Sequence, residues 1–220
     1  LDAVGVVLFC AGWLWETARA ALGRTSLSDV RQARRTLLGI LLAVLPALGV
    51  GAGLHGVIKR HLFQPWTVAV GLMAGGVAIF AVERWRPEER TSDLGRVTLQ
   101  QAFLIGVGQC LSLWPGVSRA GATILSGLCL GLDHPTAAAF SFLLSIPIIF
   151  GAGMYQLLKV SRHGIPLNVV MPYMVGFGVA AVVGYLCIHL FLLYLRRNSL
   201  YPFALYCALV GVVVLARMLL

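Results

Sequence analysis

Charged side chains are scarce in this chain, and acidic ones are scarcer than basic ones. Charged residues make up 11% of the 220 residues, with eight Asp and Glu against 17 Lys and Arg. A soluble domain of this length needs far more charge to cover its surface. Apolar residues make up 59% of the sequence, and the mean hydropathy is +0.89. The composition therefore indicates an integral membrane protein.

Cysteine is also sparse, and its distribution excludes further classes of site. The five cysteines lie singly inside apolar runs, at Cys10, Cys110, Cys129, Cys187 and Cys207. Their spacing is not typical of a zinc site or a disulfide framework. The simplest interpretation is that they are small apolar packing residues, and we assign no metal-ligating residue from the sequence.

The net charge of +9 does not indicate nucleic-acid binding, because the basic residues fall in short connections between apolar runs. Basic loops of this kind orient a membrane protein, with the richer side in the cytoplasm. The first and third connections carry most of the charge, at Arg19, Arg24, Arg31, Arg34, Arg35, Arg84, Arg86, Arg90 and Arg96. They are two spans apart, so both fit the cytoplasmic side.

Apolar runs long enough to cross a bilayer, roughly 18 residues or more, follow one another closely. We place the membrane spans at about Leu1–Trp15, Leu37–Leu54, Trp66–Val82, Thr136–Leu158, Val169–Leu195 and Leu200–Leu220. This pattern predicts an all-α polytopic membrane protein with one transmembrane domain over residues 1–220. The chain begins inside an apolar run and not with Met, so we expect it to be N-terminally incomplete.

A polar linker at about 83–97 divides the chain into two parts that resemble each other weakly. Leu41–Leu54 is similar to Phe142–Met154, with Pro46 matching Pro147 and a Gly-Ala-Gly triplet in each. Internal repeats are common in transporter-like membrane folds, where the site lies at the repeat interface. The alternative is that Leu, Ala, Gly and Pro recur through composition alone.

The apolar stretch Leu99–Leu132 is interrupted by Pro115 and Gly116. Each half is too short to span about 30 Å of hydrocarbon as a helix. Two short helices with a Pro-Gly break predict a re-entrant hairpin, since irregular backbone at membrane depth must be buried or line a cavity. The alternative is one long helix kinked at the proline.

Arg119 is the one basic residue deep between two apolar runs, and its nearest acid, Asp133, is nearly four helical turns away. A charge at membrane depth normally faces a cavity or a partner. An arginine with no carboxylate nearby in the sequence favours an anionic ligand, and its planar fork suits phosphate. The alternative is an arginine that extends to the lipid headgroups.

The residues around Arg119 favour the same interpretation. A helix that starts near Ser118 presents free backbone N–H groups and a positive dipole end to an anion. Gly116 and Gly121 allow close backbone approach. The hydroxyl of Thr123, four residues after Arg119, lies on the same helical face as the arginine, and Ser126 extends that face. The candidate site comprises Arg119, Ser118 and Thr123 as catalytic residues and Gly116, Gly121, Gln109 and Ser126 as substrate-binding residues. For Gln109 the alternative is a plain contact between helices.

Asp133-His134-Pro135 predicts a helix start, with an acidic residue and proline near the first turn. His134 is expected at the membrane interface, next to a connection. Glu83, Glu88 and Glu89 lie in the polar linker, and we expect their carboxylates to be solvated.

The segment WPGVSRAGATI, residues 114–124, resembles the Pro-Gly-x-Ser-Arg-Ser-Gly-x-Thr motif of the bacterial undecaprenyl-diphosphate phosphatase family, also called the bacitracin-resistance protein family. The flanking segments QAFLIGVGQCLSLWPG and GLDHPTAAAFSFLLSIPIIFGAG, Gln101–Gly116 and Gly131–Gly153, are similar to that family as well. The likeness extends more loosely over most of the chain.

The resemblance implies hydrolysis of a long-chain polyprenyl diphosphate, which recycles the carrier lipid for cell-wall synthesis in the bacterial cytoplasmic (inner) membrane. It implies an all-helical fold with inverted repeats and re-entrant helices, and a divalent metal such as Mg or Ca. Arg119, Ser118 and Thr123 would hold the diphosphate. A homodimer is a further expectation.

Two positions depart from the family pattern. Ala120 replaces the second serine of the motif, and a pair of glutamates that the family carries in its first repeat is not found in this sequence. Glu16 has no second glutamate near it. We expect the glutamate pair upstream of Leu1. The alternatives are a lipid-phosphate transporter or flippase with the same architecture, or a degenerate member that binds phosphate without hydrolysing it.

Overall fold

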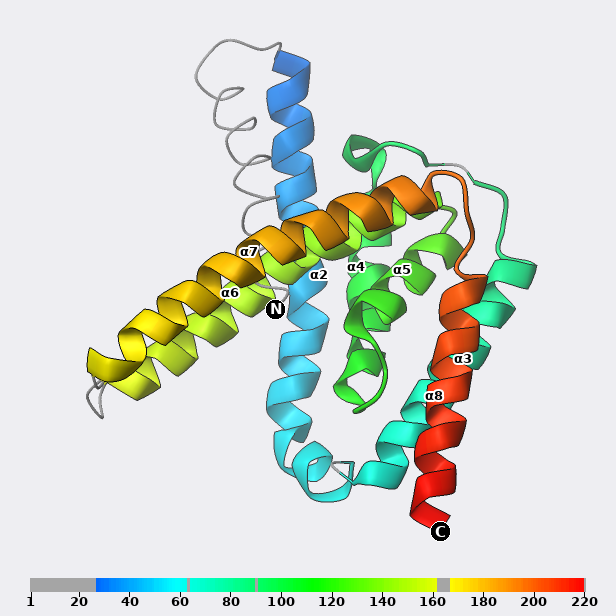
Figure 1. Ribbon diagram of the computed structural model, residues 1–220. Helices are drawn as coiled ribbons and strands as arrows, with labels where there is room; N and C mark the ends of the chain where they lie inside the picture. The colour runs from blue at the N-terminus through cyan, green and yellow to red at the C-terminus, as the bar shows by residue number, and fades with distance from the viewer. Residues whose placement is uncertain (1–26, 63, 90, 162–166, 220) are drawn as a thin grey trace.

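The computed structural model describes residues 27–62, 64–89, 91–161 and 167–219, and every regular element in these ranges is a helix (Figure 1). The α-helices are α2 (Leu27–His61), α3 (Pro65–Trp85), α4 (Leu99–Gln109), α5 (Arg119–Cys129), α6 (His134–Ser161), α7 (Leu167–Leu195) and α8 (Tyr201–Leu219). Two short 3₁₀ helices, η2 (Leu94–Arg96) and η3 (Cys110–Leu113), precede and follow α4.

Five of these helices are long and apolar enough to cross a membrane. Their spanning segments are Arg34–Leu54, Pro65–Trp85, His134–Gln156, Met171–Leu195 and Tyr201–Met218. They coincide with the apolar runs that the sequence predicted, apart from the run at 1–15, which lies outside the described residues. The chain is an all-α polytopic membrane protein.

Small residues let the helices of the bundle approach closely. α3 packs along α8, and a Cβ added to Gly76 would lie 2.9 Å from the carbonyl oxygen of Ala204. α2 packs along α4, and a Cβ on Gly106 would lie 2.2 Å from the carbonyl oxygen of Ala43. Glycine at these positions brings the two backbones together, as is common between membrane helices.

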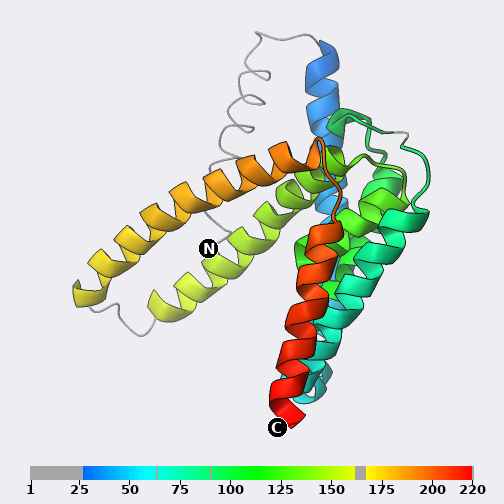
Figure 2. The ribbon, with the colours of Figure 1, turned by 45° about the vertical axis from the view of Figure 1, so that its right-hand side comes forward.

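α6 and α7 form a long pair that extends away from the rest of the bundle in both views (Figures 1 and 2). The first half of α6 is buried against α5 and α2 through Ala137, Phe140 and Leu143. Its second half is exposed, as is most of α7. Exposed apolar side chains on membrane-crossing helices can face lipid, and we expect those of this pair to do so.

The start of α6 agrees with the sequence prediction. The helix begins at His134, and the Asp133 carboxylate accepts a hydrogen bond from the backbone N–H of Thr136 at 2.8 Å. The capping residue satisfies one of the open N–H groups in the first turn. This cap fixes the point at which the chain leaves α5 and enters α6.

α4, η3, residues 114–118 and α5 form an antiparallel pair of short helices, which we call the hairpin (Figure 1). Its two ends meet at the base, where the Gln101 side chain donates to the carbonyl of Leu130 at 3.1 Å. Its tip, residues 114–118, is not helical. The backbone is therefore broken at Pro115, as predicted, and does not continue as one kinked helix.

The hairpin tip packs against the first two turns of α3. The indole N–H of Trp114 donates to the carbonyl of Thr67 at 3.0 Å, and a Cβ on Gly71 would lie 2.6 Å from the carbonyl of Pro115. The tip and base thus lie toward opposite ends of α3. Re-entry of the hairpin from one membrane face and the inverted repeats stay predictions.

Candidate functional site

The hairpin tip leads directly into the N-terminus of α5. Ser118 is the N-cap, and its hydroxyl accepts a hydrogen bond from the backbone N–H of Gly121 at 3.2 Å. Arg119 is the first residue of the helix and is half-buried. Arg119 therefore belongs to the first turn of α5, at the positive end of the helix dipole, and a cation and this dipole end both favour a bound anion.

Gly116 is required by the backbone of the tip. Its φ is +95°, in the region that residues with a side chain rarely adopt. A Cβ at this position would lie 2.2 Å from the carbonyl oxygen of Val68 in α3. We predicted Gly116 as a place for close approach of a ligand, and the structure adds a structural reason, the close approach of α3.

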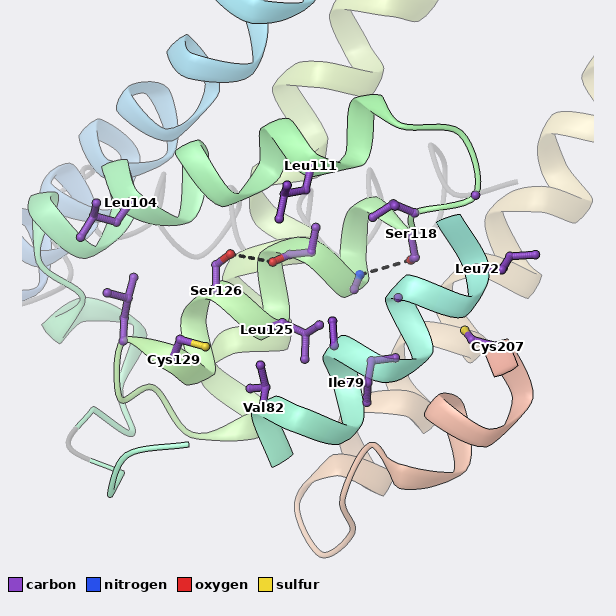
Figure 3. A pocket seen from close by; sticks show the side chains of 17 residues that line it. Leu72, Ile79, Val82, Leu104, Leu111, Ser118, Leu125, Ser126, Cys129 and Cys207 are labelled. Carbon is purple, nitrogen blue, oxygen red and sulfur yellow. Dashed lines mark hydrogen bonds between the residues drawn. The ribbon is translucent and has the colours of Figure 1, made fainter. Parts of the chain in front are cut away.

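A cavity of about 410 Å³ lies between α3, α4, α5 and α8 (Figure 3). Four of the predicted site residues line it, namely Gly116, Ser118, Gly121 and Ser126. The rest of the lining is almost wholly apolar and comprises Leu72, Gly75, Ala78, Ile79, Val82, Leu104, Leu111, Val117, Ala122, Leu125, Cys129, Leu130 and Cys207. The cavity has two hydroxyls, one at the N-cap of α5 and one within that helix, and the remaining lining side chains are apolar or cysteine.

Thr123 lies on a different face of α5 from the cavity. Its side chain is 2% exposed, and its hydroxyl lies 2.6 Å from the hydroxyl of Ser141 in α6. It is also within hydrogen-bond distance of the carbonyls of Arg119 and Ala120, at 3.0 and 3.1 Å. In this structure Thr123 joins α5 to α6, and its predicted contact with substrate stays a prediction.

Gln109 lies on the face of α4 that packs against α2. It shares this buried face with Ala102, Ile105 and Gly106, at helical spacing. Gln109 is 2% exposed, and its side-chain oxygen has no hydrogen-bond partner among the described residues. A buried amide oxygen without a partner is costly. The other residues of this face are apolar, so packing alone does not explain a glutamine at this position.

One polar pocket lined by Arg119, Ser118, Thr123 and Gln109 was expected from the sequence, and the cavity is not that pocket. Arg119, Thr123 and Gln109 are not among its lining residues. Ser126, which does line it, donates to the carbonyl of Ala122 at 2.8 Å (Figure 3). Helical spacing indicates that Arg119 and Thr123 share one face of α5 while Gln109 lies on α4, but it could not determine which neighbour each face meets.

A second polar cluster lies at the hairpin base, and the sequence did not predict it. Glu83 was expected to be solvated; this was wrong, since its side chain is 2% exposed. Its carboxylate lies 2.8 Å from His134 Nε2, accepts from the backbone N–H of Leu200 at 2.6 Å and lies 3.7 Å from Arg86 Nε. One carboxylate thus joins α3, the start of α6 and the start of α8.

A signal for this cluster was present in the sequence. Glu83 falls inside the last turn of an apolar helix, and an acid within a membrane span usually has a partner. The linker beside it, which is rich in charge, made solvation the simpler interpretation. The partners His134 and Leu200 are 51 and 117 residues away, and sequence reasoning has no rule that brings them together.

Replacing Glu83 with Ala is expected to destabilise the fold by about 3 kcal/mol, because removing one partner of a buried pair leaves the others unsatisfied. His134 and the N–H of Leu200 would lose their acceptor. The check is a thermal melt of the purified protein in detergent, followed by circular dichroism. Glu88→Ala is the matched control, since Glu88 is exposed in the same linker. Equal melting temperatures for the two variants would show that the cluster contributes nothing to stability.

The metal that the resemblance implies can be tested against the donors present. The described residues contain no group of three or more His, Cys, Asp or Glu side chains that could hold a metal ion. Glu83 and His134 are engaged with each other and with Leu200. The described donors by themselves therefore form no site for a divalent metal, and Glu16 lies outside the described residues.

Comparison with known protein families identifies one relationship that covers nearly the whole chain. A family model described as "Bacitracin resistance protein BacA" matches residues 3–213. The match includes the hairpin, the tip with its Pro-Gly break and all the membrane-crossing helices up to most of α8.

Proposed function

Because this chain belongs to the bacitracin resistance protein BacA family, we propose that it hydrolyses undecaprenyl diphosphate to undecaprenyl phosphate and orthophosphate. Membership in this family of phosphatases supports a hydrolase in general. The observation that carries the specific proposal is the position of Arg119, at the first turn of a capped helix that starts at a broken, glycine-containing tip. This arrangement suits the terminal phosphates of a lipid.

The proposed reaction requires charge stabilisation more than any other contribution. Water attacks the terminal phosphorus, the bond from that phosphorus to the bridging oxygen breaks, and the lipid monophosphate leaves with that oxygen. Phosphoryl transfer of this kind depends on positioning and on stabilising the charge of the phosphoryl oxygens. Arg119 and the N-terminal dipole of α5 supply positive charge for this purpose.

We propose that the site faces away from the cytoplasm, in the bacterial inner membrane. The hairpin base lies at the end of the bundle where the Gln32 side chain of α2 contacts Asp93. The segments at this end hold seven arginines, namely Arg34 and Arg35 in the first half of α2, Arg84 and Arg86 at the end of α3, Arg96 in η2, and Arg196 and Arg197 after α7. The tip lies toward the other end of α3. Since the arginine-rich end of a membrane protein faces the cytoplasm, this distribution supports a tip open to the outer face of the membrane.

A divalent metal remains part of the proposal through the resemblance alone. A bound metal would neutralise phosphate charge, and addition of a chelator is expected to stop hydrolysis. Hydrolysis that is unchanged after exhaustive chelation would remove the metal from the proposal, leaving Arg119 and α5 as the source of positive charge.

The proposal is tested with the full-length protein, purified in detergent and supplied with undecaprenyl diphosphate. Orthophosphate release and the lipid product are measured together. We expect one orthophosphate for each lipid monophosphate formed. Binding of the lipid without phosphate release would contradict the enzyme and favour a degenerate phosphate-binding member. Movement of the intact diphosphate across vesicles would favour a transporter.

A further inference from the structure

We propose that the cavity between α3, α4, α5 and α8 holds the first isoprene units of the lipid, next to its diphosphate. This inference rests on the proposed function, because it takes the lipid as the ligand and the start of α5 as its headgroup site. The prenyl chain would lie along one face of α5, and Gly75 of α3 would leave room for the chain.

The cavity runs lengthwise between two helices that start at the hairpin tip. On α3 its lining residues include Leu72, Gly75, Ile79 and Val82, which share one face at helical spacing. On the α5 side the lining runs from Ser118 at the N-cap through Leu125 to Cys129, as Figure 3 shows, and Ala122 also belongs to it. The end of the cavity at Gly116 and Ser118 adjoins the helix N-terminus, and the other end, at Val82 and Leu130, lies near the base.

This arrangement matches an amphiphile with an anionic head and an apolar chain. The polar end of the cavity lies at the positive end of α5, within one residue of Arg119. The remaining walls are hydrocarbon, and a volume of about 410 Å³ is within the usual range for small-ligand sites, roughly 300–1,000 Å³. A headgroup held at the tip would direct its chain along α5.

Water is a poor occupant of the same space. A buried water needs two to four polar partners, and the hydroxyls in the lining are those of Ser118 and Ser126. Each already makes one hydrogen bond, since Ser118 accepts from the N–H of Gly121 and Ser126 donates to the carbonyl of Ala122. Two hydroxyls eight residues apart therefore offer a water few partners at any one place. An apolar chain loses nothing in these surroundings.

The cavity is expected to position the chain more than to increase affinity. Transfer of a prenyl chain from lipid into protein removes little surface from water, so the gain is van der Waals packing and not the hydrophobic effect. Packing against fixed walls depends on shape. The cavity should therefore decide how the reacting phosphate is aligned and which chains fit.

Gly75 provides a way to fill the cavity without disturbing the fold. No described atom lies within 4 Å of a Cβ built on Gly75, whereas the neighbouring Gly76 packs against α8, with a Cβ 2.9 Å from the carbonyl of Ala204. Leu also favours the helix more than Gly does. Gly178 in α7 is the matched control, because a Cβ there likewise meets no described atom within 4 Å and Gly178 is outside the cavity.

The kinetic experiment compares Gly75→Leu and Gly178→Leu with the unchanged full-length protein, using farnesyl diphosphate and isopentenyl diphosphate. Gly75→Leu is expected to lower kcat/KM for farnesyl diphosphate about tenfold, equal to about 1.4 kcal/mol. The loss should be smaller for isopentenyl diphosphate, whose single isoprene unit fills less of the cavity. Gly178→Leu should match the unchanged protein. Equal kcat/KM values for Gly75→Leu and Gly178→Leu on farnesyl diphosphate would overturn the proposal.

A binding experiment separates this inference from the proposed function. The probe is a prenyl bisphosphonate that cannot be hydrolysed and carries a diazirine on its second isoprene unit. After photolysis, mass spectrometry should find the label on α3 and α5 at cavity positions, and Gly75→Leu should reduce it. Labelling at these positions in a protein that releases no phosphate would uphold the chain site and overturn the hydrolase. Phosphate release with labelling confined to α6 and α7 would uphold the hydrolase and overturn the chain site.

Discussion

Arg119→Ala is expected to abolish hydrolysis of a long-chain prenyl diphosphate by the full-length protein. Arg119 is the first residue of α5, at the positive end of the helix dipole, so the dipole adds to the positive charge available there. Losing the charged partner of a buried anion costs several kcal/mol, and each 1.36 kcal/mol of transition-state stabilisation is about tenfold in rate. The expected loss in kcat/KM is therefore about a hundredfold or more, measured as phosphate release in detergent.

Three further variants define what Arg119 contributes. Arg119→Lys should retain little of the hydrolysis rate, because the lysine ammonium is a point charge and cannot hold two phosphate oxygens as the planar guanidinium does. Arg96→Ala is the matched control, since Arg96 lies at the base with its side chain 83% exposed. Ser118→Ala should reduce the rate less than Arg119→Ala, and a larger loss would identify a serine nucleophile. Near-full hydrolysis by Arg119→Ala would exclude this motif as the catalytic site.

Local signals in the sequence were sufficient to predict the helices and the break at Pro115 in the described part of the chain. Apolar runs predicted the membrane-crossing helices in the described part of the chain because length and composition alone determine whether a helix can span a bilayer. The Pro115-Gly116 pair predicted the break because proline removes a backbone donor and glycine allows positive φ. Asp133 predicted the start of α6 because a carboxylate satisfies N–H groups there.

The arrangement of the site depends on packing that the sequence does not contain. Arg119 and Thr123 share a helical face, but that face meets Ser141 of α6 and not the cavity, because α6 packs on that side of α5. Glu83 is buried because the start of α6 and the start of α8 converge on it. Each contact joins segments far apart in the chain, so helical periodicity could indicate which residues share a face and not what that face meets.

Gly116 can be required either by the fold or by the ligand, and one substitution separates the two. Gly116→Ala would place a side chain at φ +95°, with its Cβ 2.2 Å from the carbonyl of Val68. The positive φ costs roughly 1–2 kcal/mol, and the displaced contact with α3 should bring the loss of stability to about 2–4 kcal/mol. The tip would shift and carry the start of α5 with it, so hydrolysis should fall as well.

Thermal melts and phosphate release are measured on the same preparations of Gly116→Ala and Gly53→Ala. Gly53 lies within α2, and no described atom is within 4 Å of a Cβ built there. Ala at that position should leave the melting temperature unchanged or raise it slightly, since Ala favours a helix over Gly by up to about 1 kcal/mol. If Gly116→Ala melts like Gly53→Ala but no longer releases phosphate, the glycine serves the approach of the ligand. If it melts lower than Gly53→Ala, the contact with α3 is what requires glycine at the tip.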